Sequence, residues 1–267
     1  MRVQHLNCGS LHPPFTPLEG IVYCLLVETN KGLVLVDTGF GTGDCTHPTR
    51  LMRFFARLVG APLDINETAV RQIERLGYSR DQVRHIVLTH LNLDHTGGLP
   101  DFPAAQVHVL RQEYDTIARP RGLVERGRVP AHWAHGPKWV IHEIGDRRWY
   151  GFGATPVLEG GQPEILLIHL PGHTRGHCGV AVATDQGWLL QCGDAASPFH
   201  PATDPYRPPG RKYPLGFLPG WVSRLAIGPN VPRLRELALR HGDEVRLISS
   251  HDTYSFLEFG GELSAAG

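Results

Sequence analysis

Cysteine is scarce in this sequence, and no cysteine stands in a paired motif. Five cysteines occur among 267 residues, widely spaced and without a CxxC pair. An odd, scattered set of this kind argues against both a disulfide framework and a zinc knuckle. We therefore expect reduced thiols.

Long apolar runs and an excess of charge of one sign are also missing. No segment approaches the roughly 18 apolar residues of a membrane span, and the opening MRVQHLNCGSLHPPF lacks the apolar core of a signal peptide. Lys plus Arg and Asp plus Glu both total 26, so there is no basic footprint for nucleic acid. These absences predict a cytoplasmic protein with a small-molecule substrate and with neither membrane nor nucleic acid as partner.

The residues that are present predict a single α/β domain over residues 1–267. Hydrophobic residues make up 41% of the chain, enough for a sizeable core. Predicted strands alternate with predicted helices, beginning with a hairpin within residues 21–39, and this alternation is typical of α/β proteins. Helices are expected over 50–59, 67–76, 111–118 and 232–240, and strands over 85–89, 106–110, 164–170, 178–184, 187–192 and 244–250.

Two further segments, about 119–163 and 197–221, are rich in Gly, Pro and aromatic residues and show no regular alternation. We interpret both as lid-like insertions, because long irregular segments in compact domains often serve as lids or binding loops.

Sixteen histidines are many for this length, and several stand where predicted strands end. The ends of neighbouring strands meet at one edge of a sheet, where active-site residues of α/β proteins commonly gather. The candidate metal ligands are His90, His173, Asp194 and His251, each after an apolar strand, together with Asp94 and His95 in the loop that follows His90.

Metal binding explains this set better than separate structural roles do. A lone histidine at a strand end is usually a hydrogen-bonded structural residue, but the immediate flanks of Asp94 and Asp194 contain no Lys or Arg. A buried carboxylate without a cation is costly. Histidine and aspartate without cysteine suit zinc, iron or manganese, and zinc is our first choice. Six ligands exceed what one tetrahedral ion uses, so two divalent ions sharing Asp194 fit the count better.

The ordered motifs VDTG, THLNLDHTGG, PGHTRGH, GDA and SSHD resemble the metallo-β-lactamase superfamily from about Ile21 to Asp252. The resemblance implies an αββα four-layer sandwich of two mixed β-sheets flanked by helices. It also implies that Asp194 bridges two metal ions and that Asp37 supports the metal loops from behind, although a turn-starting role before Thr38 explains Asp37 equally well. The other ligands divide between a first position with His90 and His173 and a second with Asp94, His95 and His251.

One residue departs from the family motif H-x-H-x-D-H, because Asn92 stands where the middle histidine is usual. Its amide oxygen is neutral and a weaker zinc donor than imidazole. We expect Asn92 either to bind the metal directly or to hydrogen-bond a metal-bound water. Three protein ligands and a water still suffice for a catalytic zinc, so the first position is expected to be active but under-occupied.

The resemblance is closest to the N-acyl-homoserine lactonase-like branch, in CLLVETNKGLVLVDTG and PGHTRGHCGV. It implies a metal-dependent hydrolase in which a metal-bound hydroxide attacks a lactone or related carboxylic ester, with Asp94 passing a proton to the leaving oxygen. One alternative is an iron-dependent oxidoreductase of the persulfide-dioxygenase kind, against which the weak first position argues. The other is a non-catalytic member that binds metal or ligand without turnover.

The substrate pocket is less well defined by the sequence. Those lactonases place a tyrosine three residues after the bridging aspartate, where this chain has Ser197. An apolar wall is expected from Trp133, Trp139, Trp149 and Phe152, with core packing as the alternative. Candidate substrate contacts are His132, Trp133, His135 and His200.

Overall fold

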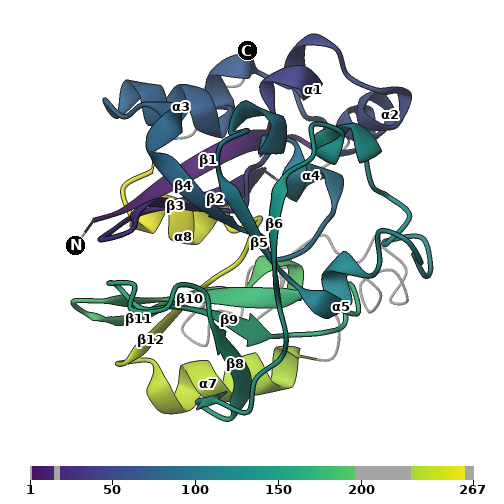
Figure 1. Cartoon of the computed structure of the whole chain (residues 1–267). Coiled ribbons are helices and arrows are strands. Elements are labelled where there is room, and N and C mark those ends of the chain that lie inside the picture. Colours follow the sequence, from purple (N-terminus) through teal and green to yellow (C-terminus); the bar gives the residue numbers. More distant parts are fainter. Residues whose placement is uncertain (1, 15–18, 196–229, 262–267) are drawn as a thin grey trace.

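Two six-stranded sheets form the centre of the molecule, and helices cover their outer faces (Figure 1). The computed structural model describes residues 2–14, 19–195 and 230–261. Within these ranges the layers follow the order helix, sheet, sheet, helix. The four-layer αββα arrangement implied by the sequence resemblance is therefore confirmed.

The first sheet mixes antiparallel and parallel pairs. Its first three strands pair antiparallel, the second and third forming the predicted hairpin, and the pairs from the third strand to the sixth are parallel. In order across the sheet the strands are β1 (Val3–Leu11), β2 (Gly20–Thr29), β3 (Gly32–Val36), β4 (Val83–Val87), β5 (Gln106–Leu110) and β6 (Lys138–His142).

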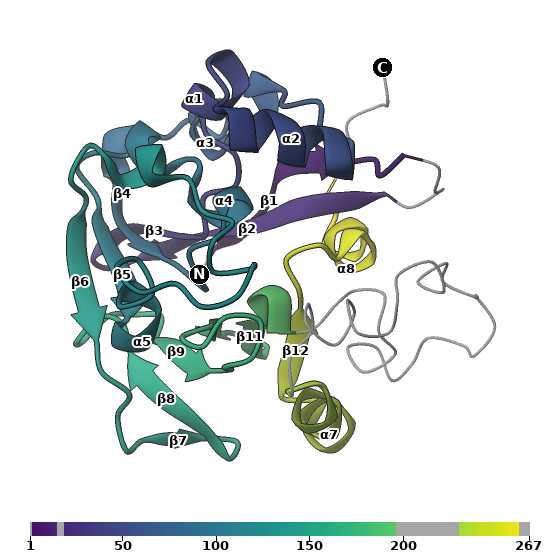
Figure 2. The same cartoon turned by 90° about the vertical axis from the view of Figure 1, so that its right-hand side faces the viewer.

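The second sheet is mostly antiparallel, and its one parallel pair joins the last strand to its neighbour. This last strand lies between two helices at the sheet edge (Figure 2). In sequence order the strands are β7 (Arg148–Trp149), β8 (Phe152–Pro156), β9 (Ile165–His169), β10 (Cys178–Thr184), β11 (Gly187–Gln191) and β12 (Val245–Ile248).

Helices were predicted at most of the places where the structure has them. The helix predicted over 50–59 is confirmed: Thr49 accepts a hydrogen bond from the amide of Met52 at its start, and Gly60 ends it at a φ of +65°. The helices are α1 (Thr42–Thr46), α2 (Arg50–Val59), α3 (Ala69–Arg75), α4 (Leu93–Thr96), α5 (Arg111–Tyr114), α7 (Val231–His241) and α8 (Thr253–Glu258).

Three apolar clusters hold the four layers together. Strand β2 shows why: Cys24 and Leu26 face the cluster under α2 and α3, whereas Tyr23 and Leu25 face the cluster between the sheets. Successive strand residues point to opposite faces, so a strand buried on both faces is apolar throughout. The third cluster packs α7 on the outer face of the second sheet.

The lid-like interpretation of residues 119–163 is wrong in part. Residues 138–156 contain β6, β7 and β8, which extend both sheets. These strands are short and lie at or near sheet edges, where partly exposed positions hide the apolar alternation. Trp149 and Phe152 are 5% and 2% exposed in the cluster under α7, so they are core residues and not a pocket wall. The insertion predicted over 197–221, with Ser197 and His200, lies outside the described residues.

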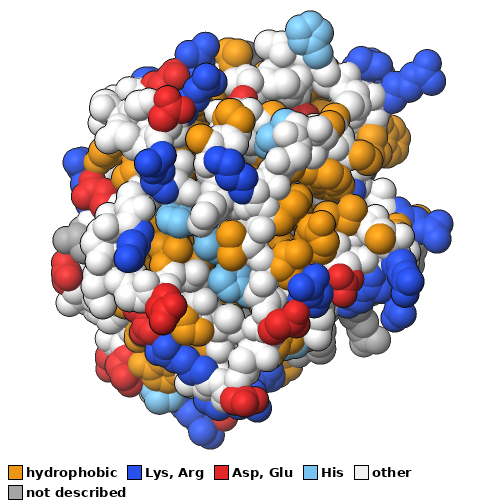
Figure 3. Space-filling model, viewed as in Figure 1, with side chains coloured by type: hydrophobic (Ala, Val, Ile, Leu, Met, Phe, Trp, Pro, Cys, Tyr) orange, Lys and Arg blue, Asp and Glu red, His pale blue; other side chains and the backbone are white. Residues whose placement is uncertain are grey.

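Charged side chains of both signs are interspersed on the face shown in Figure 3, as their equal totals lead one to expect. In the described part of the chain, we find no helix with the length and apolar character needed to cross a membrane.

Candidate metal centre

The predicted ligands meet where strands of both sheets end. The first sheet contributes His90, just after β4, and α4 carries Asp94 and His95. The second sheet contributes His173 from the loop after β9, Asp194 from a short 3₁₀ turn after β11, and His251 after β12. The site therefore depends on the two sheets being packed together.

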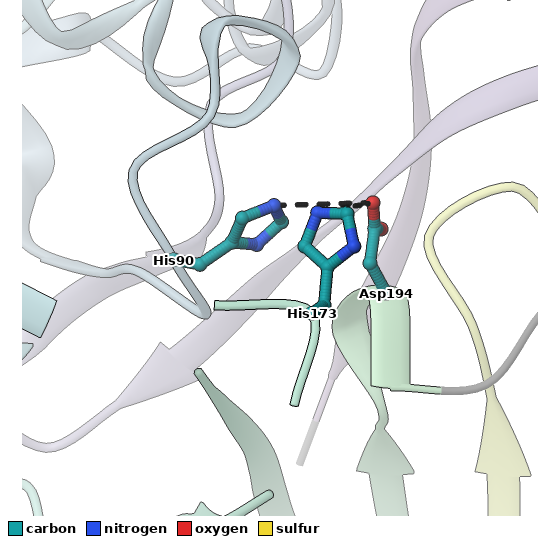
Figure 4. A group of neighbouring side chains, drawn as sticks. All are labelled: His90, His173 and Asp194. Atoms are coloured by element: carbon teal, nitrogen blue, oxygen red, sulfur yellow. Dashed lines mark ion pairs between the residues drawn. The ribbon is translucent and has the colours of Figure 1, made fainter. Parts of the chain in front are cut away.

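One group of ligand atoms consists of His90, His173 and Asp194 (Figure 4). Oδ2 of Asp194 lies 3.9 Å from Nε2 of His90 and 3.4 Å from Nε2 of His173. All three ligand atoms of this first group lie within 4.8 Å of one another. This spacing is compatible with a single bound cation.

A second group consists of Asp94, His95 and His251. Oδ2 of Asp94 lies 3.8 Å from Nε2 of each histidine. Oδ1 of Asp194 lies 3.4 Å from Nε2 of His95 and 3.5 Å from Nε2 of His251. The two oxygens of Asp194 thus face different groups, as a bridging carboxylate requires.

Unpaired polar atoms test whether these residues suit a metal. Nε2 of His90, Nε2 of His95 and Oδ1 of Asp194 are buried and have no hydrogen-bond partner. Buried polar atoms in native proteins are nearly always paired, and a bound ion is a standard explanation for the exceptions. Since all three atoms are imidazole or carboxylate donors, the residues fit divalent cations.

The electrostatics of the site also favour a cation. Burial opposes the ionisation of Asp194, but the surrounding histidines outweigh it and hold its pKa well below the usual range. Burial opposes protonation of His251, yet the Asp194 carboxylate raises the pKa of His251 to about 9. Burial lowers the pKa of His90 well below 6.5. The site thus pairs an anionic carboxylate with a neutral imidazole, two forms that bind metals.

Asn92 lies against the first group. Its Nδ2 atom is 2.9 Å from Nε2 of His173, and its Oδ1 atom is buried without a hydrogen-bond partner. The two ends of a side-chain amide have nearly the same shape, and a half-turn of the group exchanges its oxygen and nitrogen. The position is compatible with both roles predicted for Asn92.

Asp37 contacts the candidate ligand His95 and the residue before His90. Its carboxylate accepts hydrogen bonds from the backbone amide and the hydroxyl of Thr89, each at 2.8 Å, and lies 2.8 Å from Nδ1 of His95. The residue has a φ of +55°, a conformation that Asp tolerates better than most residues. The Asp37 carboxylate thus holds both Thr89, which precedes His90, and His95.

His177, which was not among the residues predicted from the sequence, is fully buried beside His90. The ring centroids of the two lie 5.0 Å apart, and Nε2 of His177 accepts a hydrogen bond from the amide of Asp194 at 3.0 Å. Its Nδ1 donates to the carbonyl of Leu170. His177 therefore holds the turn that carries Asp194. The second histidine of PGHTRGH was a signal for this residue.

His132 was predicted to contact substrate, but its surroundings do not support that role. The residue is 3% exposed, with Nδ1 2.9 Å from Oγ1 of Thr96 and Nε2 3.0 Å from Oδ1 of Asp44. Both ring nitrogens are engaged inside the protein, so His132 joins α4 to α1. Trp133 is half-buried and His135 is exposed, and their contacts with substrate stay predictions.

Comparison with protein families and with known proteins agrees with this geometry. The sequence model of the metallo-beta-lactamase superfamily matches residues 17–226. The chain is 42% identical over 259 residues to a Mycobacterium tuberculosis protein named "Probable metallo-hydrolase", covering 94% of this chain and 80% of the relative.

More distant relatives include lactonases. An N-acyl homoserine lactonase of Bacillus sp. is 26% identical over 240 residues, covering 89% of this chain and 84% of the relative. A solved structure of an N-acyl homoserine lactone hydrolase, with its product bound at the catalytic metal centre, superposes with a TM-score of 0.65 at 22% identity. That superposition covers 99% of this chain and 97% of the hydrolase, and it supports the fold.

Proposed function

Because the chain belongs to the metallo-beta-lactamase superfamily, we propose that it is a metal-dependent hydrolase that cleaves a lactone or a related carboxylic ester. The observation that carries the proposal is the pair of ligand groups sharing Asp194, with buried donor atoms that lack any other partner. The substrate class is supported by the lactonase relative.

We assign two divalent ions to the site, zinc being our first choice and iron or manganese the alternatives. The first group with Asn92 would hold one ion, and the second group the other, with Asp194 between them. Divalent ions bound there would supply a Lewis acid for the carbonyl oxygen and would lower the pKa of bound water to about 7. Asn92 makes the first position the weaker of the two.

The far ring nitrogen of three histidine ligands is held by another group of the chain. Nδ1 of His95 contacts Asp37, Nδ1 of His251 donates to the carbonyl of Ile21 at 2.9 Å, and Nδ1 of His90 lies 3.0 Å from Oγ1 of Thr89. A hydrogen bond to one ring nitrogen fixes the tautomer, so in the neutral ring Nε2 carries the lone pair. The rings are therefore oriented before any ion enters, but His95 and His251, whose pKa neighbouring carboxylates raise against the effect of burial, would release a proton when an ion binds.

Asp94 is the residue to which we assign proton transfer. It is 6% exposed, and its carboxylate lies beside His95 and His251. A carboxylate in this position can hold the proton that water loses and pass it to the leaving oxygen when the ester bond breaks. Its predicted role as both ligand and acid/base residue is part of the proposal.

The proposal also places the protein in the cytoplasm, acting on a small molecule. All five cysteines are free, which is usual in a reducing compartment.

A substrate panel tests the function. Protein loaded with zinc, manganese or iron would be incubated with lactones, aryl esters, thioesters and phosphodiesters. We expect turnover of lactones or aryl esters, and its loss in His95→Ala with folding unchanged. Full activity of His95→Ala would refute the mechanism. An absence of turnover with every metal would favour a binding protein, and oxygen consumption with a persulfide would favour the oxidoreductase.

A further inference from the structure

Glu113, in α5, joins the two loops that carry the first ligand group. Its side chain is fully buried. Oε1 accepts a hydrogen bond from the amide of Leu91 at 3.0 Å, and Oε2 accepts one from the hydroxyl of Thr174 at 2.6 Å. Leu91 lies between His90 and Asn92, and Thr174 follows His173. One carboxylate therefore spans the loop after β4 and the loop after β9.

Arg128 neutralises this carboxylate inside the protein. Its Nη2 donates to Oε1 of Glu113 at 2.8 Å, and the two side chains are 6% and 1% exposed. Nε and Nη1 of Arg128 are buried and have no hydrogen-bond partner. A buried ion pair with unpaired donors often contributes no more stability than apolar residues of the same size. Stability alone is thus a weak reason for having this pair here.

The loop after β9, which carries His173, is contacted on two sides by residues near the Glu113–Arg128 ion pair. A Cβ atom at Gly176 would lie 2.0 Å from the backbone nitrogen of Glu113, so the PGHTRGH turn rests directly on α5. On the other side, Glu125 accepts a hydrogen bond from the amide of Arg175 at 3.2 Å. Residues 119–128 therefore contact and support the loop that carries His173.

The second ligand group has a different support. His95 is held by Asp37, and His251 by the carbonyl of Ile21. A change at Glu113 should accordingly act on one group and leave the other nearly untouched.

We propose that Glu113, paired with Arg128, is a positioning residue that sets the spacing of His90, Asn92 and His173 and thereby the affinity of the first group for its ion. The inference rests on the proposed metal-dependent function. It assigns a role to two residues that do not touch the site themselves.

The test is a zinc titration of metal-free protein in competition with a chromogenic chelator, which resolves two binding steps. His173→Ala and His251→Ala assign the steps to the first and second groups. In Glu113→Gln the first-group step should weaken about 10- to 100-fold, the range typical of residues that orient metal ligands, while the second-group step changes less than about threefold.

Glu67→Gln is the matched control. Glu67 is also a buried carboxylate that accepts hydrogen bonds from a backbone amide and a hydroxyl, both of Ser10, but it joins no metal loop. We expect Glu67→Gln to leave both zinc steps unchanged. Equal weakening of both steps in Glu113→Gln, or affinities like those of Glu67→Gln, would overturn the inference.

Thr174 provides a second variant that does not alter the buried charge. Thr174→Val removes the hydroxyl that donates to Glu113, whereas Thr174→Ser keeps it, so Ser should restore the first-group step that Val weakens. Equal affinities in the two variants would count against the inference. A wild-type protein that binds no zinc would overturn the proposed function and the inference together, whereas two zinc steps unaffected by Glu113→Gln would overturn the inference alone.

Discussion

Oδ2 of Asp37 lies 2.8 Å from Nδ1 of His95, and both side chains are only 1% exposed. Asp37 follows β3 and His95 lies in α4, so this contact joins two loops of the first sheet. A carboxylate at Nδ1 directs Nε2 of His95 toward Asp94 and Asp194. It also raises the basicity of the ring as a ligand.

Asp37→Asn is therefore expected to weaken metal binding at the second group about 10- to 100-fold without unfolding the protein. The amide keeps the shape of the side chain but loses the charge that holds the His95 proton. Chelator competition measures the affinity, and circular dichroism checks the fold. Asp101→Asn is the control, because Asp101 is a buried carboxylate that binds Thr42 instead. Unchanged zinc affinity in Asp37→Asn would refute the role of this contact.

Asn92→His is expected to strengthen the first position. An imidazole is a better zinc donor than an amide, and Asn92 already lies 2.9 Å from Nε2 of His173. Elemental analysis of protein purified without chelators should show zinc rising from about one toward two equivalents per chain. Asn92→Ala should not show this rise. The same zinc content in the wild type and Asn92→His would mean that position 92 does not limit occupancy.

Chelation of the metal should destabilise the protein. A ligand present at 100 times its Kd stabilises the native state by about 2.7 kcal/mol per site. For a chain of this size that corresponds to a fall in Tm of roughly 5–10 °C per site on treatment with EDTA. Thermal unfolding measures the change, and added zinc should reverse it. An identical Tm with and without chelator, in protein that contained metal at the start, would contradict the assignment of these residues as ligands.

His132→Ala should lower stability and leave KM nearly unchanged. The substitution leaves Asp44 and Thr96 without their buried partner, which costs about 1–3 kcal/mol. Denaturant unfolding measures this cost. His135→Ala is the matched control on the same segment, because His135 is exposed and its loss should stay within about 0.5 kcal/mol. A large rise in KM with no loss of stability in His132→Ala would restore the substrate role.

Stability should fall in mild acid because of a row of histidines away from the metal ligands. Nε2 of His108 lies 3.0 Å from Nδ1 of His85, and Nδ1 of His108 lies 2.9 Å from Nε2 of His142. Burial, followed by the two neighbouring rings, lowers the pKa of His108 to about 3 from its ordinary 6.5. Between pH 6.5 and about pH 3, the unfolded chain therefore binds a proton at His108 that the folded chain does not bind. The contribution of His108 to the free energy of unfolding is fully present above about pH 6.5 and is lost as the pH falls toward 3.

Urea unfolding of metal-free protein between pH 7.5 and 5 checks this prediction. The slope of unfolding free energy against pH should be shallower in His108→Gln than in the wild type, by at most about 1.4 kcal/mol per pH unit for one proton. The slope is compared, and not the absolute stability, because the substitution also changes packing. Parallel slopes would show that His108 is not the titrating group.

Much of the fold was predictable from local patterns. Two apolar runs around Asn-Lys-Gly predicted the hairpin of β2 and β3, and the helix predicted over 50–59 matches α2. Strands β6 to β8 were missed, because short strands at or near sheet edges have no continuous apolar run. Their placement depends on the neighbours that pair with them and not on their own residues.

The candidate ligands were also chosen from sequence alone, since an apolar strand ending in His or Asp can be recognised without knowing the fold. His90, His173, Asp194 and His251 were selected in this way, and the structure brings them together. What the sequence did not disclose was the support behind them. Glu113 and Arg128 have no local pattern that separates them from ordinary buried or charged residues, and His177 is marked only by its place in PGHTRGH.

The amino-acid sequence by itself thus determined which groups can bind a metal, because the donor chemistry belongs to each side chain. Tertiary structure decided how those groups are spaced, which oxygen of Asp194 faces which group, and that His132 is occupied within the protein. These properties arise from contacts between residues far apart in the chain. The packing of the two sheets and of the helices on them, which buries the polar atoms and limits their partners, determines these properties.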